Sequence, residues 1–417
     1  MKQMDIFVYF DGVQVDAPVL MGTLTAVPLR GKEVFSFQFS EVWIQGKLAR
    51  SFDPDLQLFR GRQYVPEGKP NFGLFLDSTP DRWGKLLMDR RESVMARAEN
   101  RPVRALRESD YLLGVFDGSR MGALRFKTDP TGSFLDDDAT LATPPWASIR
   151  ELEHASLQLE AEDHVVSGRW LNLLLRPGSS LGGARPKANI LDESGHLWIS
   201  KFPSRKDRKD VGAWEAVCMH LARLAGISVS DWKVEKYSSG YHTFLTERFD
   251  RNEEGRRIHY TSAMTLLGYN DGVDAASGAS YLELADWISR NCFDVEKNLT
   301  ELFRRMVFNI AVSNCDDHLR NLGFLYTPKG WTLSPAFDLN PDEYGTGLSL
   351  CINEHDNALD FRLVEEVAPY FGIPPSVAVD IISSICRVVR QWPSLATSYG
   401  IPRGGQEVMQ GCFRECS

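Results

Sequence analysis

The sequence lacks the features of a membrane-spanning or secreted protein. No apolar stretch reaches the roughly 18 residues that a membrane-spanning helix needs, and the first residues, Met1-Lys-Gln-Met-Asp-Ile-Phe, contain no signal-peptide apolar core. The seven cysteines include no Cys-x-x-Cys pair, a pattern that favours reduced core thiols over zinc sites or disulfides. We therefore expect a cytoplasmic protein without a membrane partner, in which Cys412 and Cys416 are the most exposed thiols.

The chain also lacks an excess of positive charge, since its 47 Lys and Arg are outnumbered by 56 Asp and Glu. The formal net charge of -9 argues against a surface that coats nucleic acid, because neutralising phosphates requires a face rich in Lys and Arg. No internal repeat or low-complexity segment is evident. What is present, 417 residues of which 43% are hydrophobic, predicts a globular chain of two or three domains.

The most informative segment is residues 313–341, which read SNCDDHLRNLGFLYTPKGWTLSPAFDLNP. Asp316 can accept a proton from an attacking hydroxyl, while Asn321 and Asp338 offer oxygen ligands to a hard cation such as Mg²⁺. In protein kinases the catalytic Asp precedes a metal-binding Asn by five positions, and a metal-binding Asp follows after a strand pair. Taken singly, each of the three residues is equally well explained by helix capping or turn chemistry. Their combination predicts a phosphoryl-transfer site.

Regular elements are predicted on both sides of this loop. Residues 322–326 and 331–333, joined by the turn 327–330, predict a hairpin after it. An amphipathic helix is predicted before it, over residues 298–312, and would hold the loop rigidly. The apolar side chains of that helix recur at three- and four-residue intervals, a pattern typical of a buried face: Leu299, Leu302, Phe303, Met306, Val307, Ile310 and Ala311.

A second candidate phosphate site lies upstream, in residues 179–202. A loop of small residues is followed by a strand, a turn at 192–195 and a second strand that carries Lys201, the order in which nucleotide kinases present backbone amides and a lysine to phosphates. The loop fits neither GxGxxG nor GxxxxGK[ST]. Lys201 is either a phosphate ligand or a strand-edge lysine whose side chain reaches to solvent. Lys187 is a second candidate for the phosphate contact.

The elements that follow keep the order of a kinase nucleotide lobe. A helix is predicted over 213–225, with Gly226 placed to end it, and strands are predicted over 232–237 and 243–249. Residues 247–249 would then form a hinge, where backbone groups could bond adenine and Phe249 could cover it. Glu215 either pairs with Lys201 or lies in solvent.

In this order the chain resembles the HipA-like serine/threonine kinases, the toxins of type II bacterial toxin–antitoxin modules. The resemblance covers nearly the whole chain, because an N-terminal stretch, FGLFLDSTPDRWG at 72–84, also looks like that family. The other matching stretches are SLGGARPK at 180–187, Lys201, ERFD at 247–250, NCDDHLRN at 314–321 and AFD at 336–338.

The resemblance implies a role for each matched residue. Asp316 would be the catalytic base, and Asn321 and Asp338 would bind Mg²⁺. Ser180, or the adjacent Ser179, would be autophosphorylated, and a phosphate placed there would repel ATP and eject the loop. The ATP-binding residues would be Gly182, Gly183, Ala184, Arg185, Pro186, Lys187, Lys201, Glu247, Arg248, Phe249, His318, Asn321, Phe337 and Asp338.

The resemblance also implies partners. These would be a protein substrate and a helix-turn-helix antitoxin similar to HipB, which would link the kinase to DNA only indirectly. The arginines between residues 82 and 107 and the charged run 204–210 are either solvated surface or a docking surface for such a partner. Asp317 departs from the small residue common in the family, and we expect its side chain to point to solvent; the alternative is that repulsion by Asp316 raises one pKa of the pair.

The sequence therefore predicts an α+β, two-lobed protein-kinase-like fold. We expect a strand-rich HipA-like accessory subdomain over residues 1–140, a nucleotide-binding lobe over 141–252 and an all-helical catalytic lobe over 253–417. The expected function is that of an ATP- and Mg²⁺-dependent protein serine/threonine kinase. Two alternatives remain open, namely a small-molecule kinase acting on a lipid, sugar or antibiotic, and a catalytically silent corepressor on a kinase scaffold.

Overall fold

The structure is a computed structural model that describes residues 3–29, 31–136, 143–161, 174 and 185–414. The chain divides into two compact units. Unit 1 comprises residues 1–205 and 250–261, and unit 2 comprises residues 206–249 and 262–417. The expected boundaries near residues 140 and 252 remain predictions. Residues 179–184, including Ser179, Ser180, Gly182, Gly183 and Ala184, lie outside the described residues.

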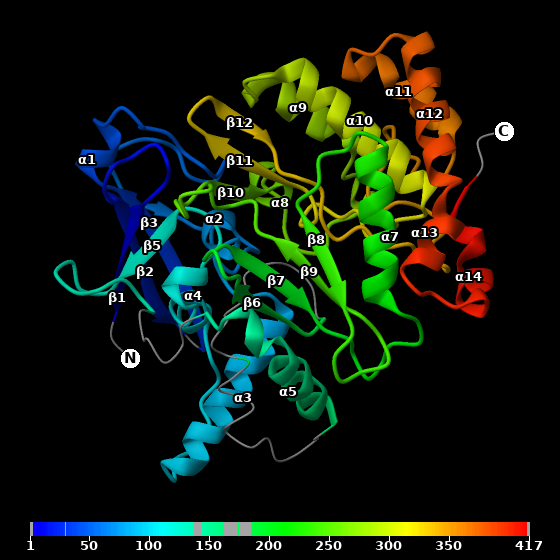
Figure 1. Ribbon diagram of the computed structural model, residues 1–417. Helices are drawn as coiled ribbons and strands as arrows, with labels where there is room; N and C mark the ends of the chain where they lie inside the picture. Colours follow the sequence, from blue (N-terminus) through cyan, green and yellow to red (C-terminus); the bar gives the residue numbers. More distant parts are fainter. Residues whose placement is uncertain (1–2, 30, 137–142, 162–173, 175–184, 415–417) are drawn as a thin grey trace. The chain divides into compact units, whose positions relative to one another are not determined.

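Unit 1 is built on a five-stranded sheet with the strand order β4-β3-β2-β1-β5 (Figure 1). Its pairings are antiparallel, and the inward-facing side chains, among them Ile6, Phe37 and Phe126, are fully buried. The sheet strands are β1 (Met4–Phe10), β2 (Val19–Leu29), β3 (Lys32–Phe39), β4 (Gln63–Tyr64) and β5 (Leu124–Lys127). Further elements of unit 1 are α1 (Glu41–Ile44), α2 (Gly73–Leu76), α3 (Arg82–Ala98), α4 (Glu108–Leu113), α5 (Ile149–Ala161), β6 (Lys187–Leu191) and β7 (Leu197–Lys201).

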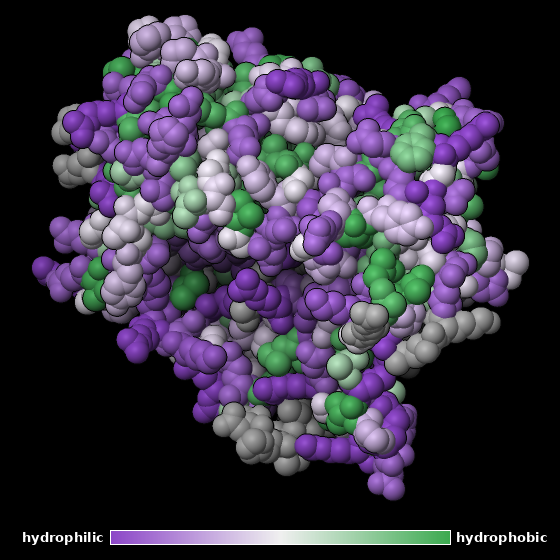
Figure 2. All heavy atoms as spheres, turned by 180° about the vertical axis from the view of Figure 1, so that it is seen from behind, coloured by the Kyte–Doolittle hydropathy of each residue, from purple (hydrophilic) through white to green (hydrophobic). Residues whose placement is uncertain are grey.

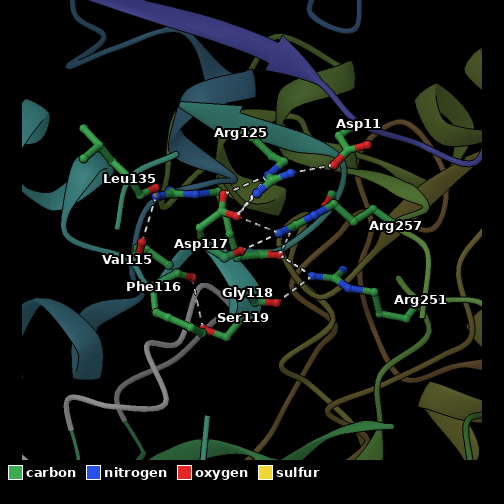
Figure 3. Close-up of polar contacts among 12 residues, drawn as sticks. Asp11, Val115, Phe116, Asp117, Gly118, Ser119, Arg125, Leu135, Arg251 and Arg257 are labelled. Atoms are coloured by element: carbon green, nitrogen blue, oxygen red, sulfur yellow. Dashed lines mark hydrogen bonds and ion pairs between the residues drawn. The ribbon is translucent and has the colours of Figure 1, made fainter. Parts of the chain in front are cut away.

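A buried ionic network joins residues 250–257 to the rest of unit 1 (Figure 3). Asp117 accepts from Arg125, whose Nη2 lies 2.6 Å from Oδ2, and Arg125 also reaches Asp11 at 2.9 Å. Arg257 donates to the backbone carbonyl of Asp117, and Arg251 donates to that of Gly118. Burial lowers the pKa of Arg257 to about 10, and the nearby Asp117 carboxylate acts in the opposite direction. Ionic contacts and hydrogen bonds thus anchor residues 250–257 to the rest of unit 1.

Unit 2 is mainly helical around α10 (Val295–Ala311), which packs against α9 (Tyr281–Asn291) and α12 (Pro375–Val389). All seven apolar residues predicted to form the buried face of α10 are buried. The hairpin of β11 (Gly323–Thr327) and β12 (Gly330–Leu333) packs near α9 (Figure 1). The remaining elements are α7 (Val211–Leu224), β8 (Trp232–Glu235), β9 (Thr243–Glu247), α8 (Ala263–Leu266), α11 (Phe361–Val367), α13 (Trp392–Ser398) and α14 (Arg403–Met409), while β10 (His259–Ser262) begins in unit 1 and ends in unit 2.

The predicted elements of the nucleotide and catalytic segments are confirmed within a few residues at their ends. Helix α7 stops where Gly226 was expected to stop it: Gly226 has a left-handed φ of 77°, and Ile227 N–H donates to Ala222 O at 2.9 Å. This is the Schellman type of helix end, which glycine adopts without steric cost. Both predicted hairpins, β8–β9 and β11–β12, are antiparallel pairs.

The cysteines agree with the expectation only in part. In the described part of the chain Cys218, Cys292, Cys315, Cys351 and Cys412 are free thiols. Cys412 is buried, with 2% of its surface exposed, so the expectation that it is exposed is wrong. Cys386 is in a disulfide bond. The expectation of reduced thiols is therefore wrong for Cys386. Cys416 lies outside the described residues.

The surface is mixed in character. Hydrophilic residues cover most of the face shown in Figure 2, and hydrophobic residues appear there in separate small groups. Among the helices of the described residues, none combines the length and the apolarity that crossing a membrane requires.

We predict that His259 makes the stability of the fold depend on pH. Its imidazole is buried against the rings of Phe10 and Phe52, at centroid distances of 5.7 and 4.3 Å, and burial lowers its pKa to about 3. Because the pKa of His259 is lower in the folded than in the unfolded chain, the unfolded chain takes up a proton at a higher pH than the folded chain does. The free energy of unfolding should therefore fall as pH falls below about 6.5. Between pH 7 and pH 5 the free energy of unfolding should fall by about 2 kcal/mol because of His259.

Urea unfolding at pH 7 and pH 5 measures the effect. In His259→Gln the pH-dependent loss should be smaller by that amount, whereas His355→Gln, at a side chain that is 89% exposed, should behave as the wild type. Equal losses in the wild type and His259→Gln would contradict the prediction.

Candidate functional site

The catalytic-loop candidate starts where helix α10 ends. Ser313 adopts a left-handed φ of 50°, and the N–H of Asn314 donates to the carbonyl of Asn309 at 2.8 Å, which closes the helix in a Schellman-type turn. The Ser313 hydroxyl then donates to the carbonyl of Cys412 at 2.8 Å. The chain therefore leaves the buried helix in a fixed direction, immediately before Asp316.

Asp316 projects outward from this loop. Its side chain is 73% exposed, and one carboxylate oxygen lies 3.5 Å from Nε2 of His318. Nδ2 of Asn321 donates to the Asp316 carbonyl at 2.8 Å, so the base candidate and the metal-ligand candidate are bonded to each other across the five-residue spacing. An exposed carboxylate beside a histidine and a bonded carboxamide can receive a proton from a bound hydroxyl group.

The side-chain amide nitrogen of Asn321 is hydrogen-bonded within the loop. Because its amide nitrogen is used by the Asp316 carbonyl, the amide oxygen faces the other way, and among the described residues nothing donates a hydrogen bond to it. Carboxamide and carboxylate oxygens suit Mg²⁺, which normally completes its shell with water and substrate phosphates. No group of three or more His, Cys, Asp or Glu that could hold a metal occurs within the described ranges, so a cation here would depend on such additional ligands.

The segment of Asp338 is held beside this loop at both ends. Ser334 N–H donates to Gly323 O at 2.9 Å, and Asp342 N–H donates to Ser313 O at 2.9 Å. Asp338 itself has a left-handed φ of 56°. This conformation costs a non-glycine residue about 1–2 kcal/mol, and such strain persists where the surroundings fix the backbone, often at functional sites. These contacts place the segment of Asp338 next to the loop that carries Asp316 and Asn321.

The two aromatic residues expected at the nucleotide also meet. The ring of Phe249, just after β9, lies 5.6 Å from the ring of Phe337, the residue before Asp338. Glu247 is half-buried and its N–H donates to Asp231 O at 2.9 Å, while Arg248 is buried, with 4% of its surface exposed. The predicted hinge residues and the Asp338 segment therefore belong to one cluster in unit 2.

Unit 1 carries the two lysines. Lys187 on β6 stands directly opposite Lys201 on β7, and both are buried. The interpretation of Lys201 as an edge lysine that reaches to solvent is therefore wrong. Lys187 lies 3.1 Å from the carboxylate of Asp81, which is also buried, and its carbonyl accepts from the indole of Trp83 at 3.2 Å. Two like charges opposite each other repel, so the Asp81 carboxylate compensates this pair.

Comparison with known proteins decides the family. The HipA-like C-terminal domain family matches residues 179–392, slightly more than half of the chain. The chain belongs to this family. It is 23% identical over 323 residues to the serine/threonine-protein kinase toxin HipA of Shewanella oneidensis, covering 68% of this chain and 72% of that protein. A putative kinase of Haemophilus influenzae is 24% identical over 179 residues, which cover 39% of this chain and 52% of the relative.

A solved structure has the same fold. The chain matches a structure of the S. oneidensis HipA, HipB and operator DNA complex with a TM-score of 0.66, covering 98% of this chain and 94% of that one at 17% identity. The predicted resemblance to HipA and the predicted α+β, two-lobed kinase-like fold are thereby confirmed. The expectation that residues 253–417 are all-helical is wrong, because strands β10, β11 and β12 lie within them.

Two expectations for this HipA-like chain are corrected by the geometry. Asp317 does not point to solvent, since only 3% of its surface is exposed. Its carboxylate accepts from the Tyr281 hydroxyl and from the Ser349 N–H, both at 2.6 Å. Burial raises its pKa to about 7, against the lowering effect of these two donors. Glu215, on α7, is not a solvated helix residue either, because only 2% of its surface is exposed.

Sequence reasoning missed several residues that shape the HipA-like site. Asp81 lies within the N-terminal stretch that carries the family resemblance, so a signal was present, although no role was attached to it. Ser349, Tyr281 and Asn309, which lie under the catalytic loop, had no local signal, because their importance depends on contacts with residues far away in the chain.

We predict that Lys187 stabilises the fold through Asp81. Replacing Lys187 with Met leaves a buried carboxylate without this cation, which should lower the free energy of unfolding by about 3–5 kcal/mol. Urea denaturation measures the change, with Lys47→Met on the exposed surface as the control. The double variant Lys187→Met/Asp81→Asn should recover part of the loss, since it removes the buried charge. Wild-type stability in Lys187→Met would contradict the structural role.

Proposed function

We propose that this HipA-like chain is an ATP- and Mg²⁺-dependent protein serine/threonine kinase that acts as a toxin. The observation that carries the proposal is the hydrogen bond from Asn321 to Asp316, with His318 3.5 Å from the Asp316 carboxylate and the Asp338 segment, which has a left-handed φ, held beside the loop. Phosphoryl transfer requires mainly positioning and charge stabilisation, and this arrangement offers both within unit 2. The names of the relatives, a serine/threonine kinase toxin and a putative kinase, agree with it.

Asp316 is the catalytic base of the proposed reaction. Its exposed carboxylate accepts the proton of the substrate serine or threonine hydroxyl as the hydroxyl oxygen attacks the γ-phosphorus of ATP, the bond from that phosphorus to the bridging oxygen breaks, and ADP leaves. His318 lies 3.5 Å from this carboxylate. A bound Mg²⁺ would neutralise phosphate charge, and Asn321 Oδ1 and the Asp338 carboxylate are the residues that would hold it.

The other proposed roles follow the family. Arg185, Pro186, Lys187 and Lys201 would contact the nucleotide with the loop Gly182–Gly183–Ala184, and Glu247, Arg248, Phe249 and Phe337 would contact the adenine side. Lys187 also pairs with Asp81, and Lys187 and Lys201 both remain candidates for the lysine that binds phosphate. Ser180 would be the autophosphorylated residue.

The proposed partners are a protein substrate and a HipB-like antitoxin. The support is the likeness to a HipA solved with HipB and operator DNA. Contact with DNA would be indirect, through the antitoxin, in line with the net charge of -9.

We predict that Asp316→Asn lowers kcat by about 10²–10⁴-fold with the fold intact, because the amide cannot accept the proton. Transfer of labelled phosphate from ATP measures it, and Asp286→Asn, an exposed aspartate on α9, serves as the control. Near-normal turnover would remove Asp316 as the base.

The same assay distinguishes the substrate classes. When the protein is incubated with labelled ATP and a cell lysate, a labelled protein band supports the protein kinase, and a labelled soluble metabolite would point to a small-molecule kinase. No turnover by well-folded protein would favour a corepressor.

We predict that Asp338→Ala weakens binding of Mg²⁺–ATP at least about 10-fold, the usual effect of disturbing a metal site. Calorimetric titration measures the Kd, with Asp356→Ala on an exposed loop as the control. Removing Mg²⁺ with a chelator should weaken binding to the wild type but hardly change binding to Asp338→Ala. An unchanged Mg²⁺–ATP affinity in Asp338→Ala would contradict its role as a ligand.

A further inference from the structure

Ser349 bonds to the residues on both sides of Asp316. Its hydroxyl donates to the carbonyl of Cys315 at 2.7 Å, and its N–H donates to the Asp317 carboxylate at 2.6 Å. Ser349 is fixed in turn, because its own carbonyl accepts from Ala275 N–H at 2.7 Å. Ser349 thus holds Cys315 and Asp317, the residues before and after Asp316. The side chain of Asp316 itself is 73% exposed.

A second set of contacts leads from Asp317 towards Asp338. The Tyr281 hydroxyl donates to Asp317 and accepts from Asn309 Nδ2 at 3.0 Å. Asn309 Oδ1 accepts from Asn314 Nδ2 at 2.9 Å, and Asn314 Oδ1 accepts from Asn340 N–H at 3.4 Å. The chain of hydrogen bonds therefore ends two residues beyond Asp338.

These contacts are buried and therefore restrictive. Asp317, Tyr281, Asn309 and Asn314 expose between 0% and 4% of their surfaces. A buried polar group that loses its partner costs about 1–3 kcal/mol, and the bonds among Asp317, Tyr281, Asn309 and Asn314 are of this buried kind. Tyr281 is itself fixed as the first residue of α9, behind the capping box of Ser280 and Glu283.

We propose that Ser349 is a positioning residue for the base, and that Asn314 is a positioning residue for the metal-binding segment. Ser349 holds the backbone around Asp316, and Asn314 holds the backbone beyond Asp338. The two contributions are separable, because Ser349 contacts Cys315 and Asp317 whereas Asn314 contacts Asn340. This inference rests on the proposed kinase function.

The test compares kcat with the Kd for Mg²⁺–ATP. Ser349→Ala removes the bond to Cys315 and keeps the N–H bond to Asp317, so kcat should fall about 10–100-fold, the effect of a small misplacement of a reacting group. The Kd should stay within about twofold of the wild type, because Asn321 and Asp338 keep their other contacts. Asn314→Ala should instead raise the Kd about 10-fold, as loss of an outer partner of a metal ligand does.

Two further variants separate positioning from general destabilisation. Ser349→Thr keeps a hydroxyl and should restore most of kcat. Ser289→Ala removes a similar bond, from a serine hydroxyl to the carbonyl of Ala285 on α9, and should change neither quantity. General destabilisation would not lower kcat in Ser349→Ala while leaving its Kd unchanged, and Ser349→Thr would not restore kcat.

The outcomes distinguish this inference from the proposed function. If the wild type transfers phosphate while Ser349→Ala has normal kcat, or loses nucleotide affinity as strongly as Asn314→Ala, the positioning roles are overturned and the kinase function stands. If the folded wild type shows no transfer, the kinase function falls and the inference falls with it.

Discussion

The cost of burying polar groups without partners is the constraint on which the catalytic-loop arrangement depends. Asp317 and the asparagines beneath the loop are almost completely buried, so each must be hydrogen-bonded. The bonds that satisfy Asp317 hold it inward, while the side chain of Asp316 is 73% exposed. The left-handed Ser313 is held by separate contacts, among them its bond to the carbonyl of Cys412.

The same constraint acts on charges in unit 1. Lys187 is buried with Asp81, and Arg257 is buried with the oxygens of Asp117. Buried ions are costly unless paired, so these residues join segments far apart in the sequence. Residues 250–261, which follow the strands β8 and β9 of unit 2 in the chain, belong to unit 1, and Arg257 is one of their links to it.

Family membership and site geometry support different conclusions. The family match and the likeness to a solved HipA show the fold, and a fold can host different functions. The proposed activity depends instead on particular atoms: the outward Asp316 carboxylate, the oriented Asn321 amide and the backbone of Asp338. The pairing of Lys187 with Asp81 adds a structural role to a residue that the sequence gave only as a phosphate contact.

By itself the sequence determined the elements whose signals are local. The apolar period of α10, the glycine at the end of α7 and the spacing from Asp316 to Asn321 all depend on residues within a few turns of one another, and the structure has them as expected. Only the tertiary structure decided the direction of Asp317, the partner of Lys187 and the position of Ser349. Those features join residues between 32 and 106 positions apart, and no local pattern encodes which distant group will satisfy a buried charge or hydrogen bond.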